Sequence, residues 1–387
     1  MHRNFATILS VSLLFGLGAG IYEFALPYFL DVSGVSVPRM GFIYAVGAIL
    51  VFFVRIYAGH LSDIFGRKSL YSVSVALTAI VNTLTPATAA VWAQAVLKST
   101  FDAGAMIFDS MYQLCLHDDN REFFLSRVGK VRGLQALAAA AGTMAAGLLL
   151  ADGIYARPFH LAAASFLVGL IVFLIGYRPR TNAAPDGDST RPSPHRSLRS
   201  LVSLDLPRPL LVLTITAFIF TVGLSISHCF VMQLFWARQF GATTSIIGII
   251  LMLHRFTIAI PLLALPWKAK THLKQIFIIF LAFEGIAIAA SGFIGSLVPA
   301  AIVWLTHDLF GAGVWMPAQS ALIQRYSRQA TRGQDTTKVF AIGSLGWIFG
   351  PLIAGAIFDR WHAGPFILSG AIVIIAAAVL LLLPDDD

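Results

Sequence analysis

The chain has 387 residues, of which 57% are hydrophobic and only 12% are charged. Soluble globular domains carry about 25% charged residues, so this composition excludes an ordinary soluble protein and predicts one that resides in a membrane. Its two cysteines, Cys115 and Cys229, lie far apart in apolar stretches and predict neither a disulfide framework nor a zinc module.

Twelve apolar stretches are each about 20 residues long, the length with which a helix crosses a hydrocarbon core of about 30 Å. In chain order they cover residues 5–30, 39–58, 69–86, 89–112, 131–151, 158–177, 209–236, 244–266, 275–294, 297–322, 337–358 and 364–384. Continuous runs such as LLFGLGAGIYEFALPYFL favour helices over the alternating strands of a β-barrel. The first stretch contains Glu23 and lacks a small-residue cleavage site, so we expect a retained helix.

Lysine and arginine are distributed unequally between the two sets of loops. With the N-terminus in the cytoplasm, 20 of them fall in inner segments, against only Arg39, Arg157, Arg238 and Arg360 in outer loops. This bias predicts that both termini face the cytoplasm. It also accounts for the net charge of +8 without a nucleic-acid partner, because membrane insertion alone selects such a pattern.

The apolar pattern is interrupted once, at residues 178–208, which are rich in Pro, Ser, Asp and Arg. This composition predicts a flexible cytoplasmic linker between two six-helix bundles at residues 1–177 and 209–387. The fourth and tenth stretches share a short pattern, FDAGAM at 101–106 and FGAGVW at 310–315. Such similarity fits a duplicated unit, a known plan among transporters.

A charged segment, GHLSDIFGRK, separates the second and third stretches. Its Gly59, Asp63, Gly66, Arg67 and Lys68 resemble, in residue type, spacing and location, the signature loop of the major facilitator superfamily. The resemblance extends over the whole chain in span count, linker position and topology. It implies an all-α integral membrane protein with twelve transmembrane helices in two six-helix bundles, working as a secondary carrier by alternating access.

The same resemblance implies a role for the charged loop. In the family, the acid that corresponds to Asp63 lies near the start of the eleventh helix, here around Thr337, where the helix dipole favours an anion. We therefore expect a latch between the two halves on the cytoplasmic side. The alternative is that Arg67 and Lys68 only enforce topology.

Ionisable residues inside the apolar stretches cost several kcal/mol unless they face a cavity or a partner. The candidates for coupling or substrate binding are Glu23, Lys98, Asp102, Asp109, His228, His254, His307 and Asp308. In the superfamily, the first, fourth, seventh and tenth spans line the central cavity, and most of these residues lie on them. A shared polar chamber between the bundles is therefore expected.

The fourth stretch carries three of these candidates on one helical stripe, because Asp102 lies about 40° and Asp109 about 20° around the helix from Lys98. Burial favours the neutral form of a carboxyl group, while a nearby cation favours its charged form. This competition suits a group that takes up and releases a coupling proton, so we expect Glu23, Asp102 or Asp109 to carry it, with Lys98 as a competing cation. The alternative is a fixed ion pair between Lys98 and Asp102 that only joins helices.

The histidines admit a second hypothesis. His228 next to Cys229, His254, and His307 next to Asp308 offer ligand types that suit iron, zinc or copper, although no single helix shows a metal-binding spacing. For each histidine a hydrogen bond between helices is an equal alternative. The first and fourth stretches also resemble facilitator-type proteins of bacterial magnetosome membranes, which implies iron or another divalent transition metal as an alternative substrate.

The eleventh stretch contains Gly346, Gly350 and Pro351 in the order Gly-x-x-x-Gly-Pro, which permits close packing and a kink. It predicts either a hinge or a packing seam. Drug/proton antiporters carry such a run in the fifth span, where this chain has GTMAAG at 142–147 without proline. That departure weighs against drug antiport.

No nucleotide-binding loop, dinucleotide fingerprint or nucleophile elbow is found in the sequence, so we expect neither an enzyme nor a bound cofactor. The prediction is a monomeric, proton-coupled carrier of a small molecule or ion in a prokaryotic inner membrane, or in an intracellular membrane derived from it. A non-transporting sensor or assembly protein on the same scaffold is the alternative from another class.

Overall fold

The computed structural model describes residues 3–120, 123–179, 205–264 and 271–385. In these ranges the secondary structure is helical and no strand occurs. Eleven of the described helical spans are long and apolar enough to cross a bilayer. Another helix of 29 residues, α4 (Val91–Asp119), carries Lys98, Asp102 and Asp109 within its length. The all-α membrane fold with twelve spans, expected from the sequence, is confirmed.

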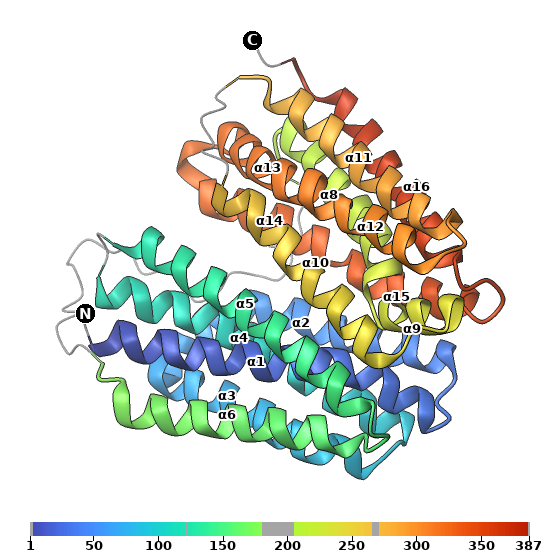
Figure 1. The fold of residues 1–387 in the computed structure, drawn as a ribbon. Coiled ribbons are helices and arrows are strands. Elements are labelled where there is room, and N and C mark those ends of the chain that lie inside the picture. The colour runs from blue at the N-terminus through green and yellow to red at the C-terminus, as the bar shows by residue number, and fades with distance from the viewer. Residues whose placement is uncertain (1–2, 121–122, 180–204, 265–270, 386–387) are drawn as a thin grey trace.

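The N-terminal half forms one bundle of six helices (Figure 1). They are α1 (Arg3–Val32), α2 (Val37–Phe65), α3 (Arg67–Leu84), α4 (Val91–Asp119), α5 (Phe124–Leu150) and α6 (Ala156–Gly176). α1 packs against α5 and α6, and α4 packs against α2 and α3. α1 and α5 approach each other closely because Gly20 and Gly142 leave room for the facing backbone.

The C-terminal half forms the second bundle, in which three spans are irregular. Its helices are α8 (Arg208–His228), α9 (Val231–Phe240), α10 (Thr244–Ala264), α11 (Leu273–Phe293), α12 (Leu297–His307), α13 (Gly313–Tyr326), α14 (Arg332–Ser344), α15 (Gly346–Ile357) and α16 (Gly364–Val379). A π-helical turn, η2 (Asp308–Ala312), joins α12 to α13, and Leu345 separates α14 from α15. The apolar pattern of the sequence did not reveal these interruptions.

Helix ends differ from the predicted spans where polar residues continue a helix beyond the apolar stretch. α2 extends to Phe65 although its apolar stretch ends at residue 58, so most of the charged segment is helical. Gly66 then ends the helix with φ of +80°, a conformation that glycine adopts without the steric cost of a side chain. The predicted linker lies mostly outside the described residues, and α8 begins at its last residue, Arg208.

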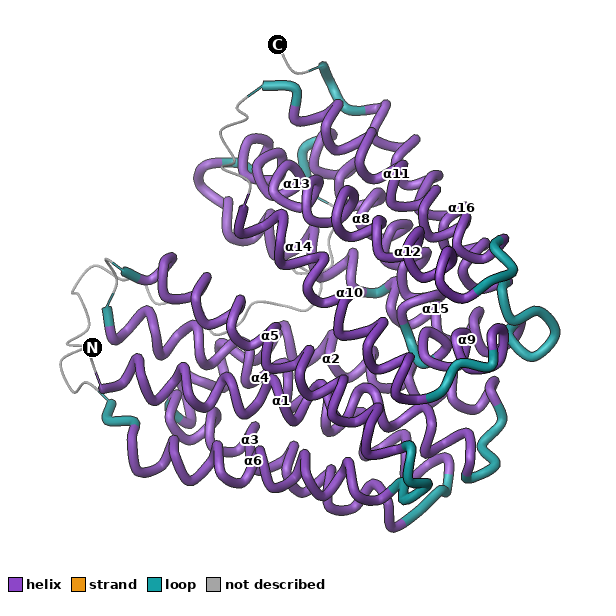
Figure 2. Tube along the Cα trace, in the orientation of Figure 1, coloured by secondary structure: helices purple, strands orange, loops and turns teal. Residues whose placement is uncertain are grey.

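The two bundles meet at one end and diverge toward the other, where the chain termini lie (Figures 1 and 2). We call these ends the distal side and the terminal side. On the distal side one apolar core includes Phe24 of the first bundle and Phe230 and Trp304 of the second. On the terminal side the second bundle has a separate core, which includes Leu213 and Leu322.

Close backbone packing and a charged bridge join the bundles on the distal side. α2 packs against α15 at Gly41, where a side chain would meet the carbonyl oxygen of Pro351, and α5 packs against α10 at Gly147. The guanidinium of Arg238 in α9 lies 2.6 Å from Asp31 of the first bundle and 2.8 Å from Asp359 of the second. The structure is therefore closed distally. If the terminal side is the cytoplasm, as the basic residues predict, this is an inward-facing arrangement.

Candidate functional site

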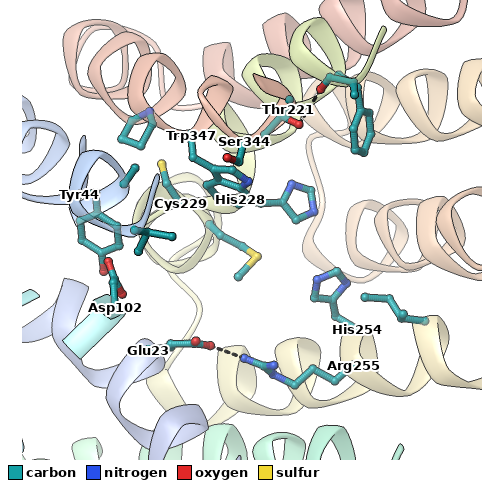
Figure 3. Close-up of a pocket in the computed structure, with 18 of the residues that line it drawn as sticks. Glu23, Tyr44, Asp102, Thr221, His228, Cys229, His254, Arg255, Ser344 and Trp347 are labelled. Atoms are coloured by element: carbon teal, nitrogen blue, oxygen red, sulfur yellow. Dashed lines mark hydrogen bonds and ion pairs between the residues drawn. The ribbon is translucent and has the colours of Figure 1, made fainter. Parts of the chain in front are cut away.

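A cavity of about 640 Å³ lies between the bundles, and both bundles contribute to its wall. Aromatic and other apolar side chains make up much of the lining, including Phe24, Tyr44, Met232, Trp315 and Trp347. Its ionisable residues are Glu23, Arg55, Lys98, Asp102, His228, Cys229, His254 and Arg255. Five of the eight predicted site residues thus line one shared cavity (Figure 3).

Lys98 and Asp102 form an ion pair in the cavity wall. They lie one turn apart on α4, and the Nζ of Lys98 is 2.5 Å from each carboxylate oxygen of Asp102. The two side chains are only 11% and 20% exposed. The Lys98 ammonium also lies over the ring of Tyr44, 4.7 Å from its centroid, where a cation–π contact adds to its stabilisation.

A glycine on α2 leaves the space that the Asp102 carboxylate occupies. A Cβ atom at Gly47 would lie 2.5 Å from Oδ2 of Asp102, closer than van der Waals contact permits. The carboxylate is therefore confined between α2 and α4, with Lys98 as the cation beside it. The arrangement thus places a carboxylate and its counter-ion side by side in the cavity wall.

Glu23 and Arg255 form a second ion pair, which crosses between the bundles. The Nη2 of Arg255 on α10 is 2.6 Å from Oε2 of Glu23 on α1, and both side chains point into the cavity (Figure 3). The backbone carbonyl of Glu23 also accepts a hydrogen bond of 3.1 Å from Gln233 of α9. The Glu23 side chain is 52% exposed, so water screens this pair more than the one on α4.

Glu23→Gln is expected to change the initial transport rate by at most about fivefold, because exposed ion pairs are worth about 0–1 kcal/mol. The pair joins the bundles, so its loss should alter the balance between conformations and not the fold. The measurement is initial solute flux in proteoliposomes, compared with the charge swap Glu23→Arg/Arg255→Glu. The swap should restore the wild-type rate, and equal rates in the single and swapped variants would contradict a role for the pair.

The three histidine candidates and Asp308 form a cluster within the C-terminal bundle. Nε2 of His228 lies 3.0 Å from Nε2 of His307, and Oδ1 of Asp308 lies 3.4 Å from the same His307 nitrogen. His254 contacts the other carboxylate oxygen of Asp308 through Nδ1. His228 and His254 reach the cavity, while His307 is fully buried. The structure thus brings together residues from the seventh, eighth and tenth spans.

Asp109 does not join the cavity, although it was placed on one stripe with Lys98. It lies 3.4 Å from Arg132 of α5, and its side chain is 40% exposed. Arg132 also donates a hydrogen bond of 3.0 Å to the hydroxyl of Tyr112. Asp109 therefore has a local partner near the terminal side, which the sequence had not indicated.

In the charged segment that was predicted to form a latch, Arg67 and Lys68 contact residues of their own bundle. Arg67 contacts Asp118 and donates a hydrogen bond of 3.3 Å to the carbonyl of Leu114, both on α4. Lys68 donates to the carbonyl of Tyr177, 3.1 Å away. Gly59 and Asp63 belong to the helical backbone of α2, but their surroundings are not among the described features of the structure. The latch between the bundles therefore remains a prediction.

Gly346 and Gly350 pack against α8, where side chains would collide with the backbone of Val222 and with Ser225. Pro351 follows one turn into α15 and faces Gly41 of the first bundle. This segment makes close contacts, and it directly follows the break at Leu345. Its role as a hinge stays a prediction.

Two features, one buried and one partly exposed, were not singled out as functional from the sequence. Glu284 of α11 is 1% exposed and accepts a hydrogen bond from the indole nitrogen of Trp315, which lines the cavity. The distal bridge of Arg238 with Asp31 and Asp359 joins three segments that are remote in sequence. The sequence shows Glu284 as an ionisable residue inside an apolar stretch, but its contact with Trp315 and the distal bridge both depend on how the helices are docked.

Comparison with known proteins agrees with this architecture. The family model of the Major Facilitator Superfamily matches residues 8–334 and 229–387. Multidrug resistance protein 2 of Bacillus subtilis (strain 168) is 24% identical over 390 residues, covering 96% of this chain and 92% of that protein.

Solved structures share the fold at low sequence identity. The xylose transporter XylE from E. coli, in an inward-open conformation, has a TM-score of 0.74 and 14% identity, over 99% of this chain and 96% of that chain. A bacterial homologue of the human lysosomal transporter Spinster, inward-facing, has a TM-score of 0.77 and 11% identity, over 98% and 95% of the two chains. Together with the family match and the cavity between twin bundles, these similarities show that the chain is a multi-pass membrane protein of the Major Facilitator Superfamily, a family of transporters rather than enzymes.

Proposed function

We propose that the protein carries a small solute through the cavity between its bundles by alternating access. The observation that carries this proposal is the cavity itself, whose charged residues come from both halves. Rocking of the bundles would separate the distal contacts at Gly41 and Gly147 and expose the same residues to the other side. The lining combines aromatic surface with both signs of charge, which suits a small organic solute with an apolar body and polar groups.

Proton coupling is proposed for the Lys98–Asp102 pair. The carboxylate lies in the cavity wall, where a proton arriving with the solute can neutralise it, and Lys98 then loses its counterion. The released ammonium can interact with a solute or compete with it. Occupancy by proton and by solute would thereby depend on each other, which is what coupling requires.

The working unit is proposed to be a monomer, because one chain supplies both halves of the cavity. A prokaryotic inner membrane is the proposed location, with the terminal side in the cytoplasm. This orientation follows from the excess of basic residues in the segments on that side.

Purified protein in proteoliposomes should take up at least one member of a panel of organic solutes, and an imposed proton gradient should drive its accumulation. A protonophore is expected to abolish the accumulation while leaving exchange across the membrane. Uptake that only equilibrates the solute, with or without a proton gradient, would identify a uniporter and contradict coupling. Absence of flux for every organic solute and metal ion, in protein that is well folded, would favour the sensor or assembly alternative.

A second candidate substrate is iron or another divalent transition-metal ion. The histidine cluster favours it, because His228 and His254 reach the cavity and His307 lies within bonding range behind them. Uptake of Fe²⁺, Zn²⁺ and Mn²⁺ in the same proteoliposomes separates this candidate from an organic solute.

A further inference from the structure

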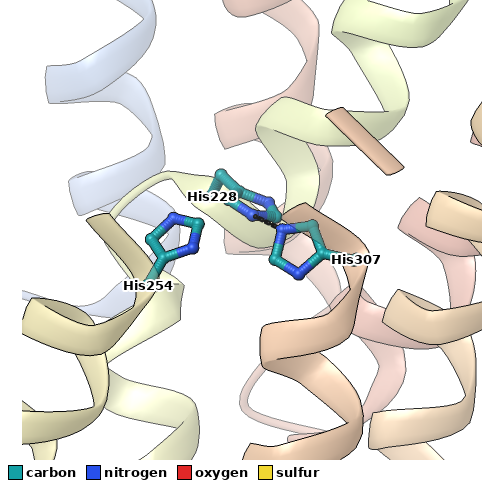
Figure 4. Close-up of side chains that lie close together, drawn as sticks. All are labelled: His228, His254 and His307. Carbon is teal, nitrogen blue, oxygen red and sulfur yellow. Dashed lines mark hydrogen bonds between the residues drawn. The ribbon is translucent and has the colours of Figure 1, made fainter. Parts of the chain in front are cut away.

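Three imidazoles from separate spans face one another in the C-terminal bundle (Figure 4). They belong to His228 at the end of α8, His254 in α10 and His307 at the end of α12. One potential ligand atom of each lies within 4.8 Å of the others. We infer that these histidines, with Asp308 as carboxylate partner, form a binding site for one divalent transition-metal ion.

The spacing of the ring nitrogens suits a small coordination sphere. Ligand atoms about 2.0–2.1 Å from a tetrahedral metal ion lie about 3.3 Å from one another. The His228 and His307 nitrogens are 3.0 Å apart, and the Asp308 oxygen is 3.4 Å from the His307 nitrogen. Small rotations of the side chains would therefore bring an ion into contact with all of them.

Hydrogen bonds on the far side of two rings orient them toward the centre. Nδ1 of His307 donates to the carbonyl oxygen of Trp304, so its Nε2 carries the lone pair that faces the cluster. Nδ1 of His228 lies 2.8 Å from the Ser227 hydroxyl, which in turn lies 2.8 Å from the Ser369 hydroxyl. Metal-binding histidines commonly have such partners, because these fix the tautomer and the ring orientation.

A hydrogen bond between the facing Nε2 atoms of His228 and His307 requires that one of these two atoms carries a proton. With the lone pair of His307 turned inward, that proton belongs to His228. A metal ion would take its place, and the proton would move to Nδ1 of His228, where the Ser227 hydroxyl can accept the hydrogen bond. The cluster can therefore bind an ion without an additional ionisation of its histidines.

Asp308 supplies the negative charge that the site needs. Its side chain is 4% exposed, and Oδ2 contacts Nδ1 of His254. Neither of these two atoms has a further hydrogen-bond partner among the described residues. A buried carboxylate beside three imidazoles offsets part of a divalent charge and orients one ring.

The backbone is irregular where the cluster forms. α8 ends at His228, before the break at Cys229 and Phe230, and α12 ends at His307, where the π-helical turn begins. The C-terminus of α8 at His228 is the negative end of a helix dipole and favours a cation, whereas at His307 the helical backbone continues into the π-helical turn. π-Helical turns within α-helices often occur at functional sites. The two irregular points in the backbone therefore each carry one histidine of the cluster.

The types of ligand atom indicate which ions the site would bind, and the cavity provides a path for the ion to enter. Three nitrogens and one carboxylate favour Zn²⁺, Co²⁺ or Fe²⁺ over Mg²⁺ and Ca²⁺, which prefer oxygen ligands. His228 and His254 line the cavity, so an ion can enter from there, while Trp304 closes the opposite side with its ring 4.5 Å from that of His254. The inference concerns binding within one bundle and does not depend on solute transport or on proton coupling.

The test is a titration of the purified full-length protein, carrying an affinity tag without histidine, with Co²⁺ and then with competing Zn²⁺. We expect one Co²⁺ per chain, visible absorption typical of nitrogen ligands, and displacement by one Zn²⁺. His228→Asn and His254→Gln should each weaken binding by about 100-fold, since even residues that only support a ligand change affinity by 10–100-fold. Ser227→Ala should weaken it by about tenfold.

His160→Gln is the matched control, because His160 is an exposed histidine at the start of α6, outside the cavity. Size-exclusion profiles and thermal unfolding show which variants remain folded. His228 and His254 are substituted because both side chains border the cavity. Wild-type protein without a stoichiometric cobalt spectrum would overturn the inference. So would cluster variants that bind as tightly as His160→Gln. Metal binding without solute flux would leave the site established and would contradict only the carrier proposal.

Discussion

Asp102→Asn is expected to abolish the solute gradient that a proton gradient sustains, while solute exchange continues. With one proton per solute, a pH difference of one unit sustains about a tenfold solute gradient, because it corresponds to about 1.4 kcal/mol. Asparagine fills the same space beside Gly47 but cannot take up a proton, so the gradient should fall to about one. Accumulation and counterflow of labelled solute, measured in the same proteoliposomes, test this.

The neutral double variant Lys98→Met/Asp102→Asn separates coupling from a structural ion pair. Removing one partner of a buried pair costs about 3–5 kcal/mol, whereas replacing both partners is often nearly neutral. The double variant should therefore be as stable as the wild type and remain uncoupled. Asp152→Asn, which changes an exposed carboxylate on the distal side, is the matched control. Full accumulation in the double variant would show that the pair only joins helix turns.

The sequence was sufficient for features that depend on a single helix. The spans were predictable because the thickness of the bilayer fixes the length of an apolar helix. The Lys98–Asp102 pair was predictable because residues four apart lie on one face of any α-helix. The end of α2 was placed too early, because the apolar stretch stops at residue 58 while helical backbone hydrogen bonding continues to Phe65.

Contacts between helices were not predictable in the same way. Asp109 was expected on the same stripe as Lys98 and without an evident partner, but it pairs with Arg132, because the docking of α5 on α4 decides its partner. Glu23 and Arg255 meet because the two bundles are juxtaposed, and a single sequence does not determine that juxtaposition. The histidines were proposed as possible ligands of one metal site, but no spacing within a single helix indicated that they meet. Their convergence depends on the breaks at Cys229 and at η2, which have no counterpart in the apolar pattern.

The glycines at the distal crossings are expected to control the conformational equilibrium, so Gly41→Ala/Gly147→Ala should open the distal side. A Cβ atom at Gly41 would collide with the carbonyl oxygen of Pro351, and one at Gly147 would lie 2.6 Å from the carbonyl oxygen of Thr244. Overpacking costs about 1–3 kcal/mol per site, and here the cost falls on the distally closed state, in which the crossings form. Each substitution should therefore reduce the population of that state roughly 5- to 150-fold relative to the open one.

Distances between spin labels report this shift directly. One labelled pair, at Ser33 and Thr243, spans the bundles on the distal side, and another, at Ser126 and Gln324, spans them on the terminal side; all four residues are exposed. In the double variant the distal distance should lengthen and the terminal distance should shorten, because rocking of rigid bundles couples the two. Gly133→Ala is the matched control, since a Cβ atom there meets nothing within 4 Å. Unchanged distances at both ends, in a folded variant, would show that the helices accommodate the methyl groups locally and that these crossings do not hold the distal side closed.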